Sequence, residues 1–202
     1  MLQFLELLAV VAAAVFGVLL ARSKRLDLVG AISVTFLVAF GGGTLRDVLL
    51  DRQPLFWIAN EHYAWIVFGI AIVGTLLPWL PRGLDRWLAM PDAVGMALFS
   101  IAGVDVALQT AGVSPFLASL FGVMTGTFGG VLGDIAVNDV PRLFQPTTPL
   151  YATCAFAGCW VHLLLRGTVV GHEVAMWVGA GTIVAFRLAA LRWQLQLPSP
   201  RR

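Results

Sequence analysis

Charge is scarce in this sequence. Of 202 residues, 12% are Asp, Glu, Lys or Arg, whereas 59% are hydrophobic, and the mean hydropathy is +0.87. A water-soluble domain of this size could not hide so much apolar surface in its core. The composition therefore excludes a soluble enzyme or binding module and predicts an all-α integral membrane protein.

Long polar segments are missing as well. A helix needs roughly 20 apolar residues to cross the hydrocarbon layer, and the stretches that reach or approach this length are 2–21, 28–50, 62–80, 91–110, 115–137, 149–166 and 172–191. The loops between them are short, which leaves no room for a catalytic or nucleic-acid-binding domain. We therefore expect seven transmembrane helices, no enzymatic activity and no nucleic-acid partner.

Cysteine and histidine are rare too. Cys154 and Cys159 lie in one apolar stretch and point about 140° apart on a helix, which favours small-residue packing over a disulfide or a metal site. The histidines, His62, His162 and His172, show no spacing typical of metal ligands. We predict no cofactor from these residues, and no metal beyond transient monovalent cations.

Basic residues are distributed unevenly between the two sides of the predicted membrane. Of the 13 Lys and Arg residues, ten fall on the side of the C-terminal tail, and the other three are Arg46, Arg52 and Arg166. Cytoplasmic loops are enriched in Lys and Arg. We therefore expect a multi-pass protein of the cell (inner) membrane with its N-terminus outside and its C-terminus in the cytoplasm.

The chain contains an internal repeat. Segment 127–141 aligns with segment 40–54 at an offset of 87 residues (127 − 40). The identical pairs are Gly42 and Gly129, Gly43 and Gly130, Leu45 and Leu132, Asp47 and Asp134, and Pro54 and Pro141. Because the matched helices are the second and the fifth, the copies must face opposite ways across the bilayer. We predict a three-helix repeat at 1–88, an inverted copy at 89–168, a seventh helix at 169–191 and a cytoplasmic tail at 192–202.

Glycine is clustered in the two matched helices. Gly41, Gly42 and Gly43 are consecutive in the second helix, and Gly129 and Gly130 are adjacent in the fifth. Each glycine costs a helix about 1 kcal/mol, and close packing needs only one small residue per turn. We therefore expect local breaks in both helices, with freed carbonyl groups that line a watery path and attract cations.

Small residues extend from these glycines along one face of each helix and end in an acid. The two series are Thr35, Ala39, Gly43 and Asp47, and Gly122, Gly126, Gly130 and Asp134. For Gly122 and Gly126, helix packing and pore lining both stay open. An acid inside a membrane helix is costly, so Asp47 and Asp134 are functional candidates. The alternative is that they are helix caps or partners of Arg46.

Three further acids receive no functional assignment. Glu6 and Asp105 stand alone in their stretches, without repeat counterparts, which favours a rim position or a buried hydrogen bond. Asp92 follows Pro91 at the expected start of the fourth helix, where an acid favours the helix N-terminus. We interpret Asp92 as a cap.

The double motif, GGTLRD at 42–47 and GGVLGD at 129–134, resembles the prokaryotic branch of the trimeric intracellular cation channel family. The domain of that branch is also called a glycine transporter domain. The resemblance covers both repeats and the seventh helix. It implies a homotrimer in membrane lipid, in which each subunit has a pore for potassium or sodium between kinked second and fifth helices, with bound lipid left open. The pore residues it carries over are Gly41, Gly42, Gly43, Arg46, Asp47, Gly129, Gly130 and Asp134.

One position departs from that family's pattern. Where the second copy usually repeats Arg-Asp, this chain has Gly133 before Asp134. We expect the missing arginine to leave the pore interior more negative. The main alternative to a channel is a secondary transporter of a small zwitterion such as glycine, because a transporter would share the inverted repeat and the broken helices.

Overall fold

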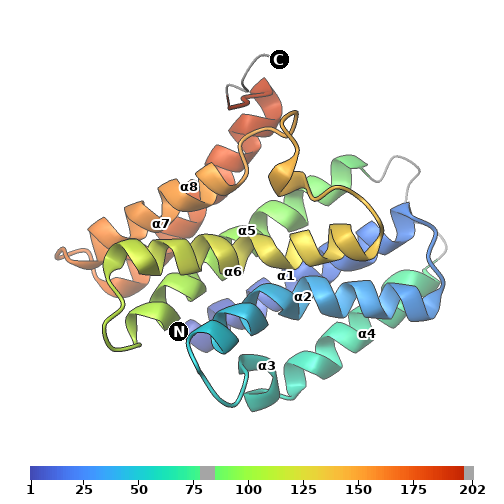
Figure 1. Ribbon diagram of the computed structural model, residues 1–202, viewed down its shortest axis with the longest axis horizontal. Coiled ribbons are helices and arrows are strands. Elements are labelled where there is room, and N and C mark those ends of the chain that lie inside the picture. The colour runs from blue at the N-terminus through green and yellow to red at the C-terminus, as the bar shows by residue number, and fades with distance from the viewer. Residues whose placement is uncertain (78–84, 198–202) are drawn as a thin grey trace.

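The computed structural model describes residues 1–77 and 85–197, and these residues form helices and no strands (Figure 1). Five helices are long and apolar enough to cross a membrane. They are α1 (Leu2–Ser23), α2 (Leu28–Leu49), α5 (Asp85–Leu108), α6 (Pro115–Ala136) and α8 (His172–Trp193). The two other predicted spans are apolar helices of 15 residues, α4 (His62–Leu76) and α7 (Ala152–Arg166). Residues 78–80 of the third predicted span lie outside the described residues.

Two short helices occupy connections that the sequence left without structure. The α-helix α3 (Phe56–Ala59) lies between α2 and α4, and the 3-10 helix η1 (Arg142–Phe144) lies between α6 and α7. They follow the two copies of the glycine motif.

The helices of the two repeats run in opposite directions. α1 packs against α5, and α2 packs against α6. The members of each pair are antiparallel (Figure 1), and they are the helices that the internal repeat relates. The fold is therefore the predicted inverted repeat, and the last helix, α8, packs on α7 and α5.

The helices α2 and α6 are continuous through their glycines. The predicted breaks, with carbonyl groups freed to line a path, are wrong. The reason is the crossing of the two helices: a β-carbon on Gly42 would collide with the carbonyl oxygen of Thr125, and one on Gly129 with the carbonyl oxygen of Val38. Glycine at these positions lets the two backbones touch.

The remaining small residues of the two series lie in helix contacts. A β-carbon on Gly122 would come 2.7 Å from the carbonyl oxygen of Ser100, and one on Gly126 would come 2.5 Å from that of Met96, both on α5. Thr35 and Ala39 of α2 are buried, with 0% and 1% of their surfaces exposed. Cys154 and Cys159 are free and buried in α7.

The helix α5 begins at Asp85, before the predicted start at residue 91, and contains Pro91 in its interior. Proline removes one hydrogen bond from a helix but does not end it when neighbouring elements hold the chain. Asp92 therefore lies inside the helix, and the interpretation of Asp92 as a cap is wrong. Its carboxylate instead accepts a hydrogen bond of 2.8 Å from the hydroxyl of Tyr151.

Candidate ion path

The first repeat holds a buried ion cluster around Arg46, at the end of the bundle where α1 starts. The Nη2 atom of Arg46 lies 2.8 Å from Oδ1 of Asp47, and its Nη1 atom lies 3.7 Å from Oε1 of Glu6. The other oxygen of Asp47 accepts a 2.8 Å hydrogen bond from the backbone N–H of Phe56. These groups and Arg52, 3.5 Å from Asp47, form the Arg46 cluster.

The Arg46 cluster ties three elements together, and its members apart from Arg52, which is 40% exposed, are buried. The side chains of Arg46 and Asp47 are fully buried, and that of Glu6 is 4% exposed. The guanidinium carbon of Arg46 also lies 5.4 Å from the centre of the Phe56 ring. Asp47 is thus both a partner of Arg46 and a cap for the following loop, and Glu6, predicted to stand alone, is a third member.

The second repeat holds a corresponding cluster around Arg142, at the opposite end of the bundle. The Nη2 atom of Arg142 lies 3.0 Å from Oδ1 of Asp134, and its backbone N–H donates a 3.0 Å hydrogen bond to Oδ2. Its Nη1 atom lies 3.8 Å from Oδ2 of Asp92. Arg142, Asp92 and Asp134 form the Arg142 cluster, in which Asp92 stands where Glu6 stands in the first repeat.

Arg142 supplies the positive charge that is missing at Gly133. Burial lowers the pKa of the Arg142 guanidinium, but Asp92, Tyr151 and Asp134 outweigh burial and raise that pKa above its ordinary value. The side chain therefore remains a cation beside Asp134. The expectation of a more negative interior is wrong, because an arginine from η1 takes the place of the arginine missing from α6.

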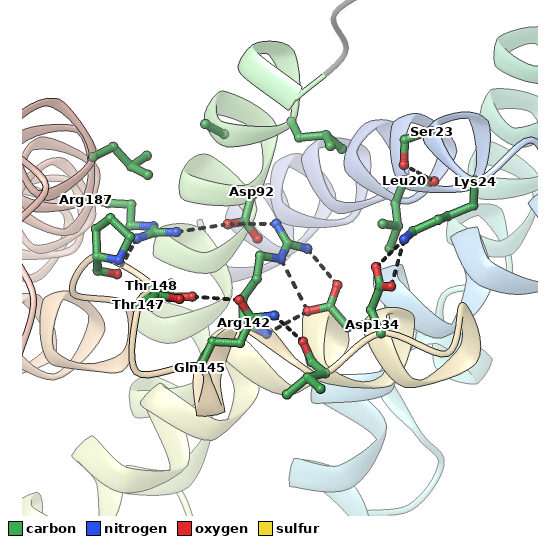
Figure 2. Close-up of a pocket in the computed structure, with 16 residues that line it drawn as sticks. Leu20, Ser23, Lys24, Asp92, Asp134, Arg142, Gln145, Thr147, Thr148 and Arg187 are labelled. Carbon is green, nitrogen blue, oxygen red and sulfur yellow. Dashed lines mark hydrogen bonds and ion pairs between the residues drawn. The ribbon is translucent and has the colours of Figure 1, made fainter. Parts of the chain in front are cut away.

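A cavity of about 480 Å³, the wide cavity, opens beside the Arg142 cluster (Figure 2). Among the residues that the structure describes, its acidic and basic lining residues are three of each kind: Asp92, Asp134 and Asp139, and Lys24, Arg142 and Arg187. Figure 2 shows Asp92 between the guanidinium groups of Arg142 and Arg187, which lie 3.8 and 3.9 Å from its Oδ2 atom. The wide cavity is thus polar and charge-balanced.

A second, narrow cavity of about 20 Å³ lies between the helices. Asp92 lines both cavities. Gly42, Gly129 and Gly130 line the narrow cavity, together with Phe99, whose ring centre is 6.2 Å from that of Phe56 under Arg46. A space of this size holds about one water molecule.

The structure brings some of the predicted pore residues together and separates others. Gly42, Gly129 and Gly130 line the narrow cavity and Asp134 the wide one. Arg46 and Asp47 belong to the buried cluster at the other end. Side chains cover Gly41 and Gly43 instead. A β-carbon on Gly41 would come 2.5 Å from Cδ1 of Leu132, and one on Gly43 would come 2.9 Å from Cζ of Phe56.

Sequence reasoning missed Asp92, Arg142, Arg187 and Tyr151. One signal could have found Asp92: it follows Glu6 by 86 residues (92 − 6), almost the offset of the repeat. Arg187 is 3% exposed and donates hydrogen bonds of 2.8 and 3.0 Å to the carbonyl oxygens of Pro149 and Leu150. Only the fold places this α8 residue beside α5.

Together, the apolar helices and the inverted repeat define a multi-pass membrane protein, and its two cavities share the lining residue Asp92. A family model described as "Glycine transporter" matches residues 3–79 and 89–167. The UPF0126 inner membrane protein YadS of Escherichia coli (strain K12) is 34% identical over 98% of this chain and 96% of that protein. A UPF0126 membrane protein of Deinococcus radiodurans is 33% identical over 99% and 92%.

Solved structures agree with these relatives. The trimeric intracellular cation (TRIC) channel orthologue from Rhodobacter sphaeroides has a TM-score of 0.88 and 32% identity, over 96% of this chain and 98% of that one. A prokaryotic TRIC channel crystallised in 0.5 M KCl has a TM-score of 0.87 and 25% identity, over 97% and 98%. The chain belongs to the prokaryotic branch of the TRIC channel family. The resemblance of its double motif is confirmed, and the chain is a membrane protein of this family rather than an enzyme.

Proposed function

We propose that the protein is a monovalent cation channel, chiefly for potassium, with a pore in each subunit where α2 crosses α6. The observation that carries the proposal is that Asp92 lines both cavities. Its carboxylate belongs to the wide cavity and also to the narrow cavity, which lies where the glycines of α2 and α6 cross. The names of the similar solved structures, which describe TRIC cation channels, support the same function.

Cation preference is attributed to Asp92 rather than to the wide cavity as a whole. The charges of the described residues that line the wide cavity balance, so these residues favour neither sign of ion. The Oδ2 atom of Asp92 is buried and accepts no hydrogen bond from the described residues, and its only charged neighbours among them, Arg142 and Arg187, stay 3.8 and 3.9 Å away. An oxygen of this kind at the entrance to a narrow passage can replace part of the hydration shell of a cation.

The Arg46 cluster closes the passage at the other end. Phe99 lines the narrow cavity, Phe56 packs against Phe99, and the fully buried Arg46 packs against Phe56. Conduction requires Phe56 and Arg46 to move aside together, because the cation–π contact and the hydrogen bond from Phe56 to Asp47 couple them. The described conformation is therefore assigned to a closed channel.

Assembly and orientation follow from the relatives and the charge distribution. We assign a homotrimer surrounded by membrane lipid, with the N-terminus outside, the C-terminus in the cytoplasm and the wide cavity facing the cytoplasm. Reporters fused after Arg25 and after Pro141 should then read cytoplasmic, and one after Pro54 external. The same reading at Pro54 and Pro141 would contradict the assigned orientation.

The function is tested by unitary currents of the purified protein in a planar bilayer with potassium chloride. Asp92→Asn should lower the potassium current, because the carboxylate charge at the entrance to the narrow cavity is lost. Glu173→Gln is the matched control: it makes the same chemical change at an exposed acid of α8 and should leave the current unchanged. Equal currents for both variants and the parent would remove Asp92 from the ion path.

Transport of a small zwitterion is the second candidate, and the description of the matching family model favours it. A carrier would alternate its access around one midplane site. It would give saturable glycine uptake into vesicles and no unitary currents, whereas a channel passes ions in resolvable steps. That pair of observations separates the two candidates.

A further inference from the structure

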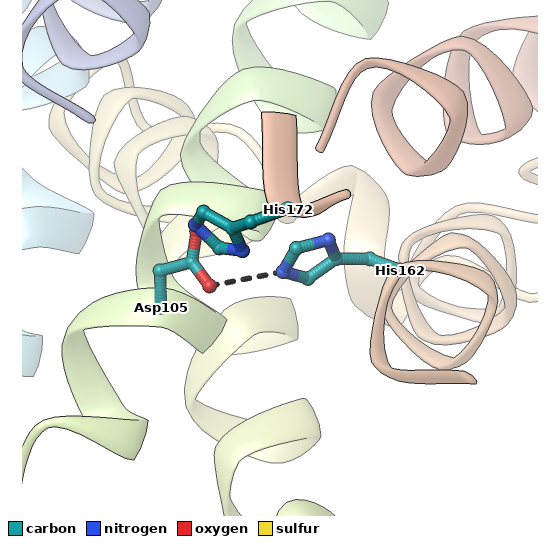
Figure 3. Close-up of side chains that lie close together, drawn as sticks. All are labelled: Asp105, His162 and His172. Atoms are coloured by element: carbon teal, nitrogen blue, oxygen red, sulfur yellow. Dashed lines mark hydrogen bonds and ion pairs between the residues drawn. The ribbon is translucent and has the colours of Figure 1, made fainter. Parts of the chain in front are cut away.

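Three potential metal ligands lie together at the end of the bundle opposite the wide cavity (Figure 3). Asp105 comes from the end of α5, His162 from the end of α7 and His172 from the start of α8. The Nε2 atom of His162 is 2.9 Å from Oδ1 of Asp105, and the Nε2 atom of His172 is 3.2 Å from Oδ2. One ligand atom from each residue lies within 4.8 Å of the other two.

The fold creates this cluster, which is why the spacing of the histidines gave no sign of it. The chain turns back between the end of α7 at Arg166 and the start of α8, so that the rings of His162 and His172 have their centres 5.6 Å apart. Asp105 belongs to an earlier helix that contacts both α7 and α8. Three separate elements thus supply one ligand each.

A small side-chain movement would complete a tetrahedral transition-metal site. With zinc–nitrogen and zinc–oxygen bonds of roughly 2.0–2.1 Å, neighbouring ligand atoms lie about 3.3 Å apart. The separations of 2.9 and 3.2 Å run to different oxygens of Asp105, and one ligand atom per residue gives a set within 4.8 Å, so the side chains would draw together slightly around an ion. Two imidazoles and one carboxylate are typical ligands of zinc, and a water molecule fills the fourth position in open sites.

Burial favours a site that is fixed but accessible. The side chains of His162 and Asp105 are 0% and 4% exposed, whereas that of His172 is 45% exposed. The Oδ2 atom of Asp105 is buried and makes no hydrogen bond within the described residues. An ion arriving from solvent past His172 would satisfy this oxygen.

We propose that Asp105, His162 and His172 bind one divalent transition-metal ion per chain, for which Zn²⁺ is the probe. Arg166, whose Nη1 atom is 3.5 Å from Oδ1 of Asp105 and whose side chain is 39% exposed, turns to solvent when the ion binds. Asp105 follows Asp92 by 13 residues on α5 (105 − 92), which is about 20 Å along a helix. The metal site therefore lies far from Asp92 and the wide cavity.

The test is titration calorimetry of the detergent-purified full chain with zinc chloride, after any affinity tag has been removed. The parent protein should bind one zinc ion per chain and melt at a higher temperature with zinc than without it. Magnesium should do neither, because it prefers oxygen ligands in octahedral geometry. Parent protein that binds no zinc would overturn the proposal.

Two histidine variants separate a built site from adventitious binding. His172→Ala, at a half-exposed residue, should fold and lose about tenfold or more of the zinc affinity. His62→Ala removes an exposed histidine outside the cluster and should bind like the parent. Equal affinities for both variants would show adventitious binding and overturn the site.

A third variant tests the role given to Arg166. Arg166→Gln should bind zinc more tightly than the parent, because it removes a cation next to the metal ligand Asp105. Weaker binding would mean that Arg166 supports the ion rather than yielding to it, which would contradict the proposed geometry.

Discussion

Two adjacent glycines of α6 should respond in opposite ways to the same small change. A β-carbon on Gly129 points at the backbone of Val38 on α2, whose carbonyl oxygen it would strike. A β-carbon on Gly130, which lines the narrow cavity, would lie 3.3 Å from the hydroxyl of Tyr151 and 3.9 Å from Oδ1 of Asp92, the residue that lines both cavities. Gly129→Ala should therefore push the helices apart, and Gly130→Ala should narrow the passage.

The magnitudes follow from helix propensity, packing and hydration. Alanine stabilises a helix by about 1 kcal/mol relative to glycine, whereas overpacking costs about 1–3 kcal/mol. Gly129→Ala should therefore lose up to about 2 kcal/mol of unfolding free energy, and Gly130→Ala should lose none. In a narrow cavity of about 20 Å³, a methyl group that removes one hydrogen bond of roughly 1 kcal/mol from a permeating ion slows it about fivefold.

The assay combines thermal unfolding and size-exclusion chromatography in detergent with unitary potassium currents in a bilayer. Gly130→Ala should elute and melt like the parent and carry about fivefold less current. Gly129→Ala, the matched control for an added methyl group, should melt at a lower temperature. A Gly130→Ala protein with the parent's current would refute the assignment of the narrow cavity to the ion path.

Three further variants test the ion clusters. Arg46→Gln should lose about 3–5 kcal/mol of unfolding free energy, because it leaves the buried Glu6 carboxylate without its basic partner. Thermal unfolding measures this loss, and an unchanged melting temperature would contradict it. Gly133→Arg should lower the melting temperature rather than restore a family-like pore, because its side chain would meet α1 and α2 and Arg142 already pairs with Asp134; an unchanged melting temperature would argue against this packing. Asp134→Asn should lower the potassium current, since Arg142 would then repel cations from the wide cavity; an unchanged reversal potential and current would exclude Asp134 from the path.

The fold was largely predictable because hydrophobicity and the repeat are encoded in local runs of residues. Apolar stretches marked the helices, and the matched acids Asp47 and Asp134 revealed the inverted copies. The structural role of the clustered glycines was not predictable, because a helix break and a close crossing of two helices both require residues without a side chain. The contact between Gly42 and the backbone of Thr125 decides between them.

The candidate site was predictable only in part, because function follows position in space rather than position in the motif. Arg142 lies nine residues after Gly133 (142 − 133), yet its guanidinium reaches the acid beside which the family arginine would stand. The cluster of Asp105, His162 and His172 likewise depends on how three helix ends meet. Neither arrangement leaves a spacing that the chain alone reveals.

The measurement that tests the central claim most directly is the reversal potential of the purified parent protein in a potassium chloride gradient across a planar bilayer. A cation channel predicts unitary currents that reverse close to the potassium equilibrium potential. Currents that reverse at the chloride potential, or glycine uptake without any unitary current, would contradict the account.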